Sequence, residues 1–185
     1  MNKNKEEYLI QFDEKKSDFS SFYSNYTDKL EFFQSPPSKF RTRAEFGVIS
    51  ENSFDFTMVE NDEKILIDQL DICNPSINQI IGHLKKQIVL SDILQEKLFQ
   101  VEIQVSRKGE CFISLIYHKL LDSNWIEKAQ ILSKKIQSSF IGRSKNQKLI
   151  IGKDYVIETY NVNGDKFQIK LYEQCFSQPN PDICD

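Results

Sequence analysis

Histidine, cysteine and glycine are scarce in this 185-residue sequence, and their scarcity excludes several classes of protein. Two histidines, His83 and His118, form no Ser/His/Asp spacing and no metallohydrolase pattern. The six glycines build neither a GxGxxG fingerprint nor a phosphate-binding loop. The four cysteines match no CxxC or zinc spacing, so we expect reduced thiols, no metal site and no hydrolase or kinase constellation.

Long apolar runs are also missing. No run approaches the 18 residues that a membrane helix needs, and the N-terminus has no apolar signal-peptide core. We therefore expect no membrane partner and a cytoplasmic location. The 39% hydrophobic and 28% charged residues are typical of a soluble globular protein, and the length fits one domain, or one domain and a small part of another. A net charge of -3 argues against a general nucleic-acid coat, although a local basic strip remains compatible with it.

The apolar periodicity predicts an α+β fold with a mainly antiparallel sheet, an N-terminal helix and two further helices. Turn residues at 52–53, 61–62, 108–110 and 163–165 separate the strands. An isoleucine- and leucine-rich stripe marks the second helix. The expected helices are 4–23, 76–89 and 123–136, and the expected strands are 39–50, 53–60, 64–69, 98–106, 111–119, 139–144, 148–152, 155–162 and 166–174.

A basic strip lies in the expected strand 39–50. Alternation places Lys39, Arg41 and Arg43 on one face, while the residues between them are mostly apolar and face inward. Guanidinium groups on such a face are suited to phosphates. The alternative is an ordinary solvated strand face, and spacing does not separate the two.

Phe99 and His118 are ambiguous for a similar reason. Phe99 begins a strand and shares the parity of Val101 and Ile103, so alternation alone predicts a core position. At the junction of two elements, however, an exposed ring is able to stack on RNA bases. His118 ends a strand, where it is either a surface residue or an RNA contact.

Several of these segments resemble the tRNA (uracil-5-)-methyltransferases of the TrmA type. The resemblance runs along nearly the whole chain in order and spacing. It rests on FQSP at 33–36, FRTRAEF at 40–46, KLFQ at 97–100, SLIYHKLLD at 114–122 followed by Trp125, IGR at 141–143 and FSQPN at 176–180.

The resemblance implies a division of labour. Residues 1–175 would be a domain that grips the T arm of tRNA and helps to turn the target uridine out of its loop. Glu45, Phe99 and His118 would contact RNA, together with the expected phosphate ligands Arg41 and Arg43. Residues 176–185 would start the connection to a Rossmann-like domain for S-adenosyl-L-methionine and pack poorly. Gln178 would contact that cofactor.

The resemblance also has departures. Phe40 replaces a typical tyrosine, and Gly47 stands where an arginine is often found, so another cation would have to compensate. The family's nucleophilic cysteine, in a C-N-P context, and its general base are expected beyond residue 185. The cysteine thiolate would add to uracil C6 and the base would remove the C5 proton.

We therefore assign no catalytic residue in these 185 residues and expect no methyl transfer by them alone, unless a separate catalytic chain joins them. A stand-alone, non-catalytic RNA-binding module is the main alternative. A protein-interaction domain with a solvated basic strand is a third.

Overall fold

The computed structural model describes residues 3–50 and 54–185, and it confirms an α+β fold with a mainly antiparallel sheet. The expected turn at Asn52-Ser53 lies outside the described residues. The elements are α1 (Lys3–Tyr23), β1 (Arg43–Ile49), β2 (Asp55–Glu60), β3 (Glu63–Ile67), α2 (Pro75–Ile88), α3 (Asp92–Gln95), β4 (Leu98–Val105), β5 (Cys111–Tyr117), α4 (Ser123–Ile136), β6 (Ser139–Ser144), β7 (Gln147–Ile151), β8 (Tyr155–Val162), β9 (Asp165–Tyr172) and a 3-10 turn at Pro181–Ile183.

Seven strands form one sheet in the order β3-β2-β1-β4-β5-β6-β7. All neighbours are antiparallel except β5 and β6, which are parallel, with Ser114 opposite Ile141. Parallel neighbours need a crossover connection, and α4 supplies it. The first and last strands, β3 and β7, are the free edges of the sheet.

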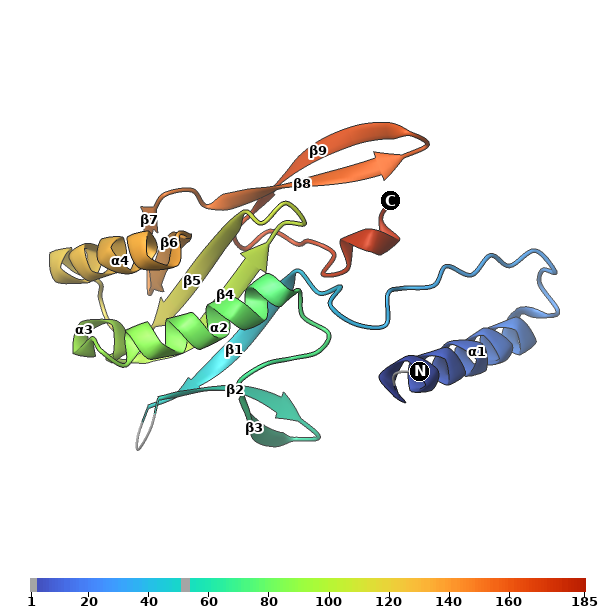
Figure 1. Ribbon diagram of the computed structural model, residues 1–185, viewed down its shortest axis with the longest axis horizontal. Helices are drawn as coiled ribbons and strands as arrows, with labels where there is room; N and C mark the ends of the chain where they lie inside the picture. The colour runs from blue at the N-terminus through green and yellow to red at the C-terminus, as the bar shows by residue number, and fades with distance from the viewer. Residues whose placement is uncertain (1–2, 51–53) are drawn as a thin grey trace.

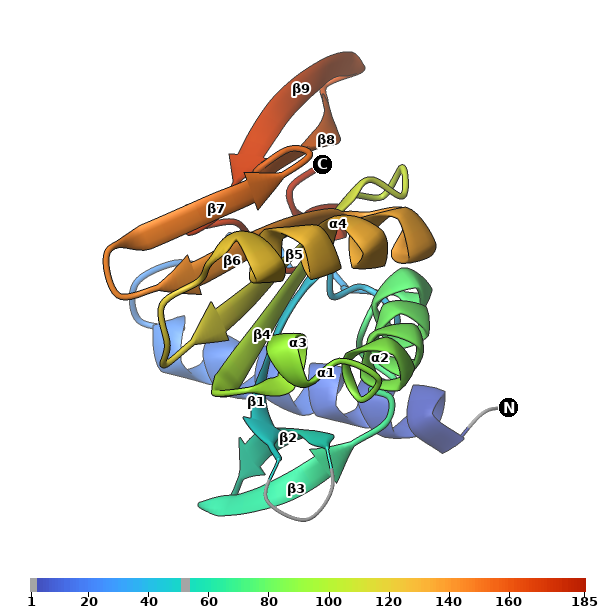
Figure 2. The ribbon, with the colours of Figure 1, turned by 90° about the vertical axis from the view of Figure 1, so that its left-hand side faces the viewer.

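Helices α2 and α4 cover one face of this sheet (Figure 1; Figure 2). The side chain of Asn74 caps α2, and Asp122 accepts a hydrogen bond from the Trp125 N–H to cap α4. Trp125 is fully buried, and a Cβ atom on Gly142 of β6 would overlap its ring, so helix and strand are in close contact. The predicted α2 stripe is confirmed, because its members are all buried: Ile77, Ile80, Ile81, Leu84 and Ile88.

The hairpin β8–β9 packs on the opposite face of the sheet. Its two-residue turn, Asn163-Gly164, has positive φ at both positions, as the sequence predicts. A small second core joins it to β5 and β6 through Phe112, Ile141, Val156 and Leu171. The hairpin leaves much of β1 and β4 uncovered (Figure 1).

The C-terminal segment also packs on this side, and the expectation that residues 176–185 pack poorly is wrong. The Thr42 N–H donates to the Pro179 carbonyl oxygen at 2.8 Å. The Ser177 hydroxyl is buried and donates to Gln104. Arg107 binds the carboxylates of Asp182 and Asp185. These contacts join residues far apart in sequence, which local composition does not reveal.

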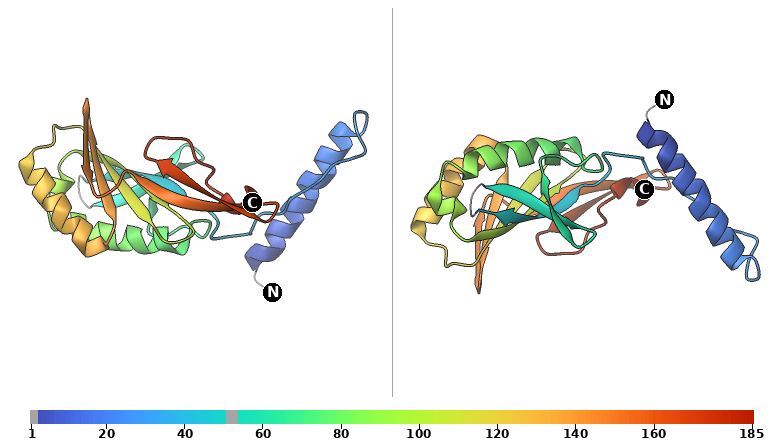
Figure 3. Two further views of the ribbon diagram at one scale, coloured as in Figure 1. Left: turned by 90° about the horizontal axis from the view of Figure 1, so that it is seen from above. Right: turned by 90° about the horizontal axis from the view of Figure 1, so that it is seen from below.

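Helix α1 stands at one end of the molecule, away from α3 and α4 (Figure 3). The Tyr8 hydroxyl donates to the Ser35 carbonyl oxygen and connects it to the segment that precedes β1. No helix among residues 3–50 and 54–185 combines the length and apolarity of a membrane span.

Candidate nucleic-acid interface

A β-bulge decides the position of Phe99. The ladder between β4 and β5 pairs Leu98 with Tyr117 and Gln100 with Ile116, so Phe99 is an extra residue without an opposite partner. Leu98 and Val101 are both buried, three residues apart, because the bulge resets the alternation. The inward position that alternation alone predicts is therefore wrong, and Phe99 lies on the uncovered side of the sheet.

The Phe99 ring stacks on His118. Their centroids are 3.9 Å apart and their planes differ by 16°. The backbone N–H of His118 donates to the Lys97 carbonyl oxygen, which fixes the strand end next to the bulge. Phe99 is half-buried and His118 is exposed. His118 therefore covers one side of the Phe99 ring, and the aromatic pair is partly exposed to solvent.

The basic strip differs from its prediction. Strand β1 begins only at Arg43, because Lys39 has a positive φ of 62° and the backbone of Arg41 instead bridges Cys73. The three cations therefore do not share one regular strand face. The inward alternation of Thr42, Ala44 and Phe46 is confirmed.

Arg43 is held by neighbouring groups. Its guanidinium donates to the Cys175 carbonyl oxygen at 3.0 Å and to Glu45 at 3.2 Å. Glu102 lies 3.5 Å from the same guanidinium. Arg41 donates through Nε to the Arg43 carbonyl oxygen. Two carboxylates thus offset the positive charge of Arg43.

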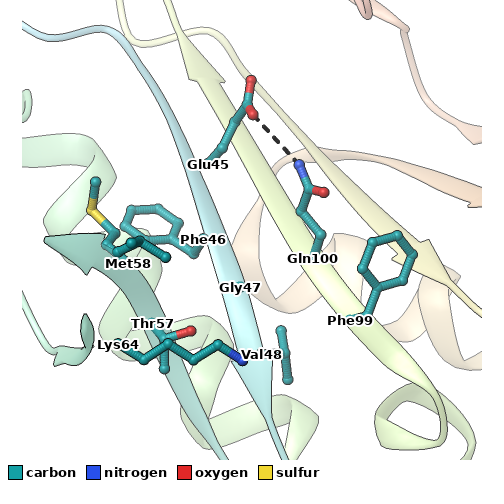
Figure 4. Close-up of a pocket in the computed structure, with 10 residues that line it drawn as sticks. Glu45, Phe46, Gly47, Val48, Thr57, Met58, Lys64, Phe99 and Gln100 are labelled. Carbon is teal, nitrogen blue, oxygen red and sulfur yellow. Dashed lines mark hydrogen bonds between the residues drawn. The ribbon is translucent and has the colours of Figure 1, made fainter. Parts of the chain in front are cut away.

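Glu45 continues this polar network toward the aromatic pair. Its carboxylate accepts from the Gln100 amide at 3.5 Å, and Gln100 also donates to Glu102 (Figure 4). Burial of Glu102, and then the nearby Glu45 carboxylate, raise its pKa despite the opposing effect of Arg43. Ionisation of the Glu102 carboxyl group on this sheet face is therefore less favourable than ionisation of a free glutamate.

We expect Glu102→Gln to raise the melting temperature at neutral pH. A folded-state pKa above the unfolded value means that ionisation of Glu102 lowers stability at high pH, and that this cost disappears below the unfolded value of 4.5. Thermal melts of wild type and variant between neutral pH and pH about 4 should converge in acid. Glu127→Gln, at an exposed site on α4, is the control. If Glu102→Gln were less stable than wild type at neutral pH, the ion pair of Glu102 with Arg43 would outweigh the cost of burying its charge.

Two hollows flank Phe99, and Phe99 lines both. The first, here the β1–β3 hollow, lies among β1, β2, β3 and the start of β4 (Figure 4). The second, the β5–β6 hollow, lies between the ends of β5 and β6. Glu45, Gly47, Thr57, Lys64 and Gln100 help to line the first; Ile116, His118, Lys119, Arg143, Lys145 and Gln174 help to line the second.

Gly47 shapes the floor of the β1–β3 hollow. A Cβ atom at this position would lie 2.8 Å from the Thr57 hydroxyl oxygen, so a larger residue requires Thr57 to move. In Figure 4 the Lys64 side chain extends from β3 toward β1 across this region.

Gln178 lies away from this face. It is exposed and lines a mostly apolar hollow against the β8–β9 hairpin, together with Phe167, Ile169 and Phe176. None of the residues that line this hollow is acidic or basic. It therefore does not fit a complete site for S-adenosyl-L-methionine, whose ammonium, carboxylate and ribose hydroxyls need charged or polar partners.

Cys73, which is buried, and Cys111, which is half-buried, are poor nucleophiles. Burial raises the pKa of the Cys73 thiol and raises the pKa of Cys111 to about 12, so neither is a thiolate at neutral pH. Within the described residues, no group of three or more His, Cys, Asp or Glu side chains is placed to hold a metal ion.

The structure brings Glu45, Phe99 and His118 together on one face, with Arg43 bound to Glu45. It does not bring Gln178 there. Sequence reasoning missed Gln100, Glu102, Lys64 and Lys145. The alternation of β4 carried a signal for Gln100 and Glu102, as polar residues between buried ones, whereas the two lysines lie in segments that meet this face only through tertiary structure.

Known proteins are similar to this chain in sequence and in fold. The family described as tRNA (Uracil-5-)-methyltransferase matches residues 7–185. A tRNA/tmRNA (uracil-C(5))-methyltransferase of Acinetobacter baylyi is 37% identical over 162 residues, which are 84% of this chain and 45% of the relative. Its counterpart from Chromohalobacter salexigens is 35% identical over 188 residues, with 97% and 50% covered. The chain thus spans about half the length of the curated relatives it matches.

A solved structure has the same fold. The tRNA (uracil-54, C5)-methyltransferase of Pyrococcus abyssi, in complex with S-adenosyl-L-homocysteine, superposes with a TM-score of 0.68. The sequences are 14% identical, and the match covers 94% of this chain and 45% of that one.

Proposed function

Because this chain belongs to the tRNA (uracil-5-)-methyltransferase family, we propose that it is the tRNA-binding portion of an enzyme that forms 5-methyluridine in the T loop. S-adenosyl-L-methionine would supply the methyl group, and the reaction would take place in the cytoplasm. The observation that carries the proposal is the Phe99–His118 stack, lifted from the core by a bulge on the uncovered sheet face.

The aromatic pair contributes stacking. A uridine that leaves its loop loses base stacking, at a cost of a few kcal/mol. The half-buried Phe99 ring would offset part of this loss through its solvent-facing side, because base–aromatic stacking is worth about 1–3 kcal/mol. His118 supports the ring from the other side at van der Waals distance.

The polar residues contribute orientation. Glu45 is exposed and accepts hydrogen bonds, so its carboxylate suits the N–H groups of a base edge. Arg41 and Arg43 remain our proposed phosphate ligands at the margin of the face. The carboxylates around Arg43 reduce its net charge, so we expect its contact to be weaker than that of a free arginine.

Methyl transfer itself would be carried out by residues of the methyltransferase domain, and we assign no catalytic residue within residues 1–185. We place the tRNA-recognition domain at residues 1–175 and the start of the connection to the methyltransferase domain at 176–185. Gln178 would add one contact to a cofactor held mainly elsewhere. If the 185 residues act as they stand, a separate catalytic chain is required.

Titration with RNA tests the proposal. We expect the purified chain to bind a T-arm stem-loop more tightly than an anticodon-arm stem-loop of equal length, measured by fluorescence anisotropy at one fixed salt concentration. We also expect no label from S-adenosyl-L-methionine in the RNA. Equal affinity for both stem-loops would favour a general RNA-binding module, and no binding would favour a protein-interaction domain. Methyl incorporation would overturn our placement of the chemistry.

A further inference from the structure

The charges around Phe99 are unevenly neutralised. Four cations line the two hollows, and two of them are paired: Lys119 donates to Glu96 at 2.8 Å, and Arg143 binds Glu173 at 2.6 Å. Lys64 and Lys145 are both exposed and form no ion pair with any carboxylate in the described residues. Among the residues that the structure describes, each hollow therefore holds one cation without an ion-pair partner.

These two lysines lie on opposite sides of the aromatic pair. Lys64 is on the edge strand β3 and lines the β1–β3 hollow, whereas Lys145 is in the β6–β7 turn and lines the β5–β6 hollow. Phe99 is the residue that both hollows share. The order across the face is thus cation, stacking ring, cation.

We propose that this arrangement is a track for one RNA strand, in which Lys64 and Lys145 bind the backbone phosphates on either side of a base that stacks on Phe99. Single-stranded nucleic acid is bound by this combination of aromatic platforms and uncompensated basic groups. The paired cations are less available, because a phosphate would first have to displace a carboxylate. Net charge -3 for the whole chain does not oppose this, because the two charges act locally.

The track rests on the proposed function, and it adds two phosphate contacts, at Lys64 and Lys145, to those proposed for Arg41 and Arg43. It also sets the path of the RNA strand, which runs between the β3 edge and the β6–β7 turn. Arg43, bound to Glu45 and Glu102, would also position Glu45 beside the track.

Salt dependence of RNA binding tests the track. Removing one cation that binds a phosphate should reduce the slope of log affinity against log salt by about 0.7–0.9. We expect this reduction for Lys64→Ala and for Lys145→Ala, and twice as much for the double variant, with a T-arm stem-loop as the probe. Lys64→Arg should keep the slope. Lys134→Ala, an exposed lysine on α4 at the opposite face, is the matched control.

The two ways of failing are distinguishable. If the unchanged chain binds no RNA, both the proposed function and the track are overturned. If it binds the T-arm stem-loop while both lysine variants keep its slope and affinity, only the track is overturned. Both lysines are exposed, so thermal melts should show unchanged folding, and a slope that falls equally for Lys134→Ala would show non-specific attraction instead of a track.

Discussion

Replacing Phe99 by alanine is expected to weaken binding of a T-arm RNA by about 1–3 kcal/mol, a loss of roughly 5- to 150-fold in affinity. The same change should leave folding nearly intact. The ring lies outside the main core, and the stacking on His118 contributes about 0.5–1.5 kcal/mol. Anisotropy titrations and thermal melts of the same samples measure the two effects.

Phe46→Ala is the matched control for this variant. Phe46 is 1% exposed in the core beside Phe56, and removing such a ring costs about 3–5 kcal/mol of stability. If Phe99→Ala melted as early as Phe46→Ala and the folded fraction bound RNA normally, Phe99 would be a core residue. The bulge would then have no part in recognition.

Arg143→Ala is expected to lower the free energy of unfolding by about 3–5 kcal/mol. Arg143 binds both oxygens of Glu173, whose side chain is 1% exposed. Without the guanidinium, Lys148 at 3.3 Å is the remaining cation that pairs with this carboxylate among the described residues. Urea unfolding at neutral pH measures the loss.

The pH dependence of stability identifies the cause of the loss in Arg143→Ala. Burial alone would raise the pKa of Glu173, but Arg143 and Lys148 reverse this and lower it. A lowered folded-state pKa stabilises the protein above the unfolded value of 4.5 and this stabilisation is lost as the pH falls through the folded value. The difference between wild type and Arg143→Ala should therefore shrink in acid. Glu173→Gln combined with Arg143→Ala should recover part of the stability, and a difference independent of pH would show that lost packing is responsible.

Local patterns predicted most of the fold. The stripe on α2, the Asn163-Gly164 turn and the alternation of Thr42, Ala44 and Phe46 each depend on a few neighbouring residues, and each is confirmed. The parallel pairing of β5 with β6 and the packing of Ser177 and Pro179 depend on contacts across the chain, so composition did not reveal them.

The candidate site was less predictable for the same reason. A single extra residue at Phe99 reverses the inward and outward order, and its cause is the pairing of β4 with β5. The charge of Arg43 was visible in the sequence, but its partners Glu102 and Cys175 are far from it in sequence. Which cations remain unpaired is therefore a property of the folded sheet.

The two free edges of the seven-stranded sheet have a consequence for solubility. Edge strands expose unpaired backbone groups that invite pairing with another molecule, and charged side chains on them discourage it. Strand β3 carries Ile65, Leu66 and Ile67 beside the charges of Glu63 and Lys64, and β7 carries Lys148 before an apolar run at 149–151. We therefore expect neutral substitutions at Lys64 to favour pairing of copies through β3, and we expect arginine to discourage this pairing as lysine does.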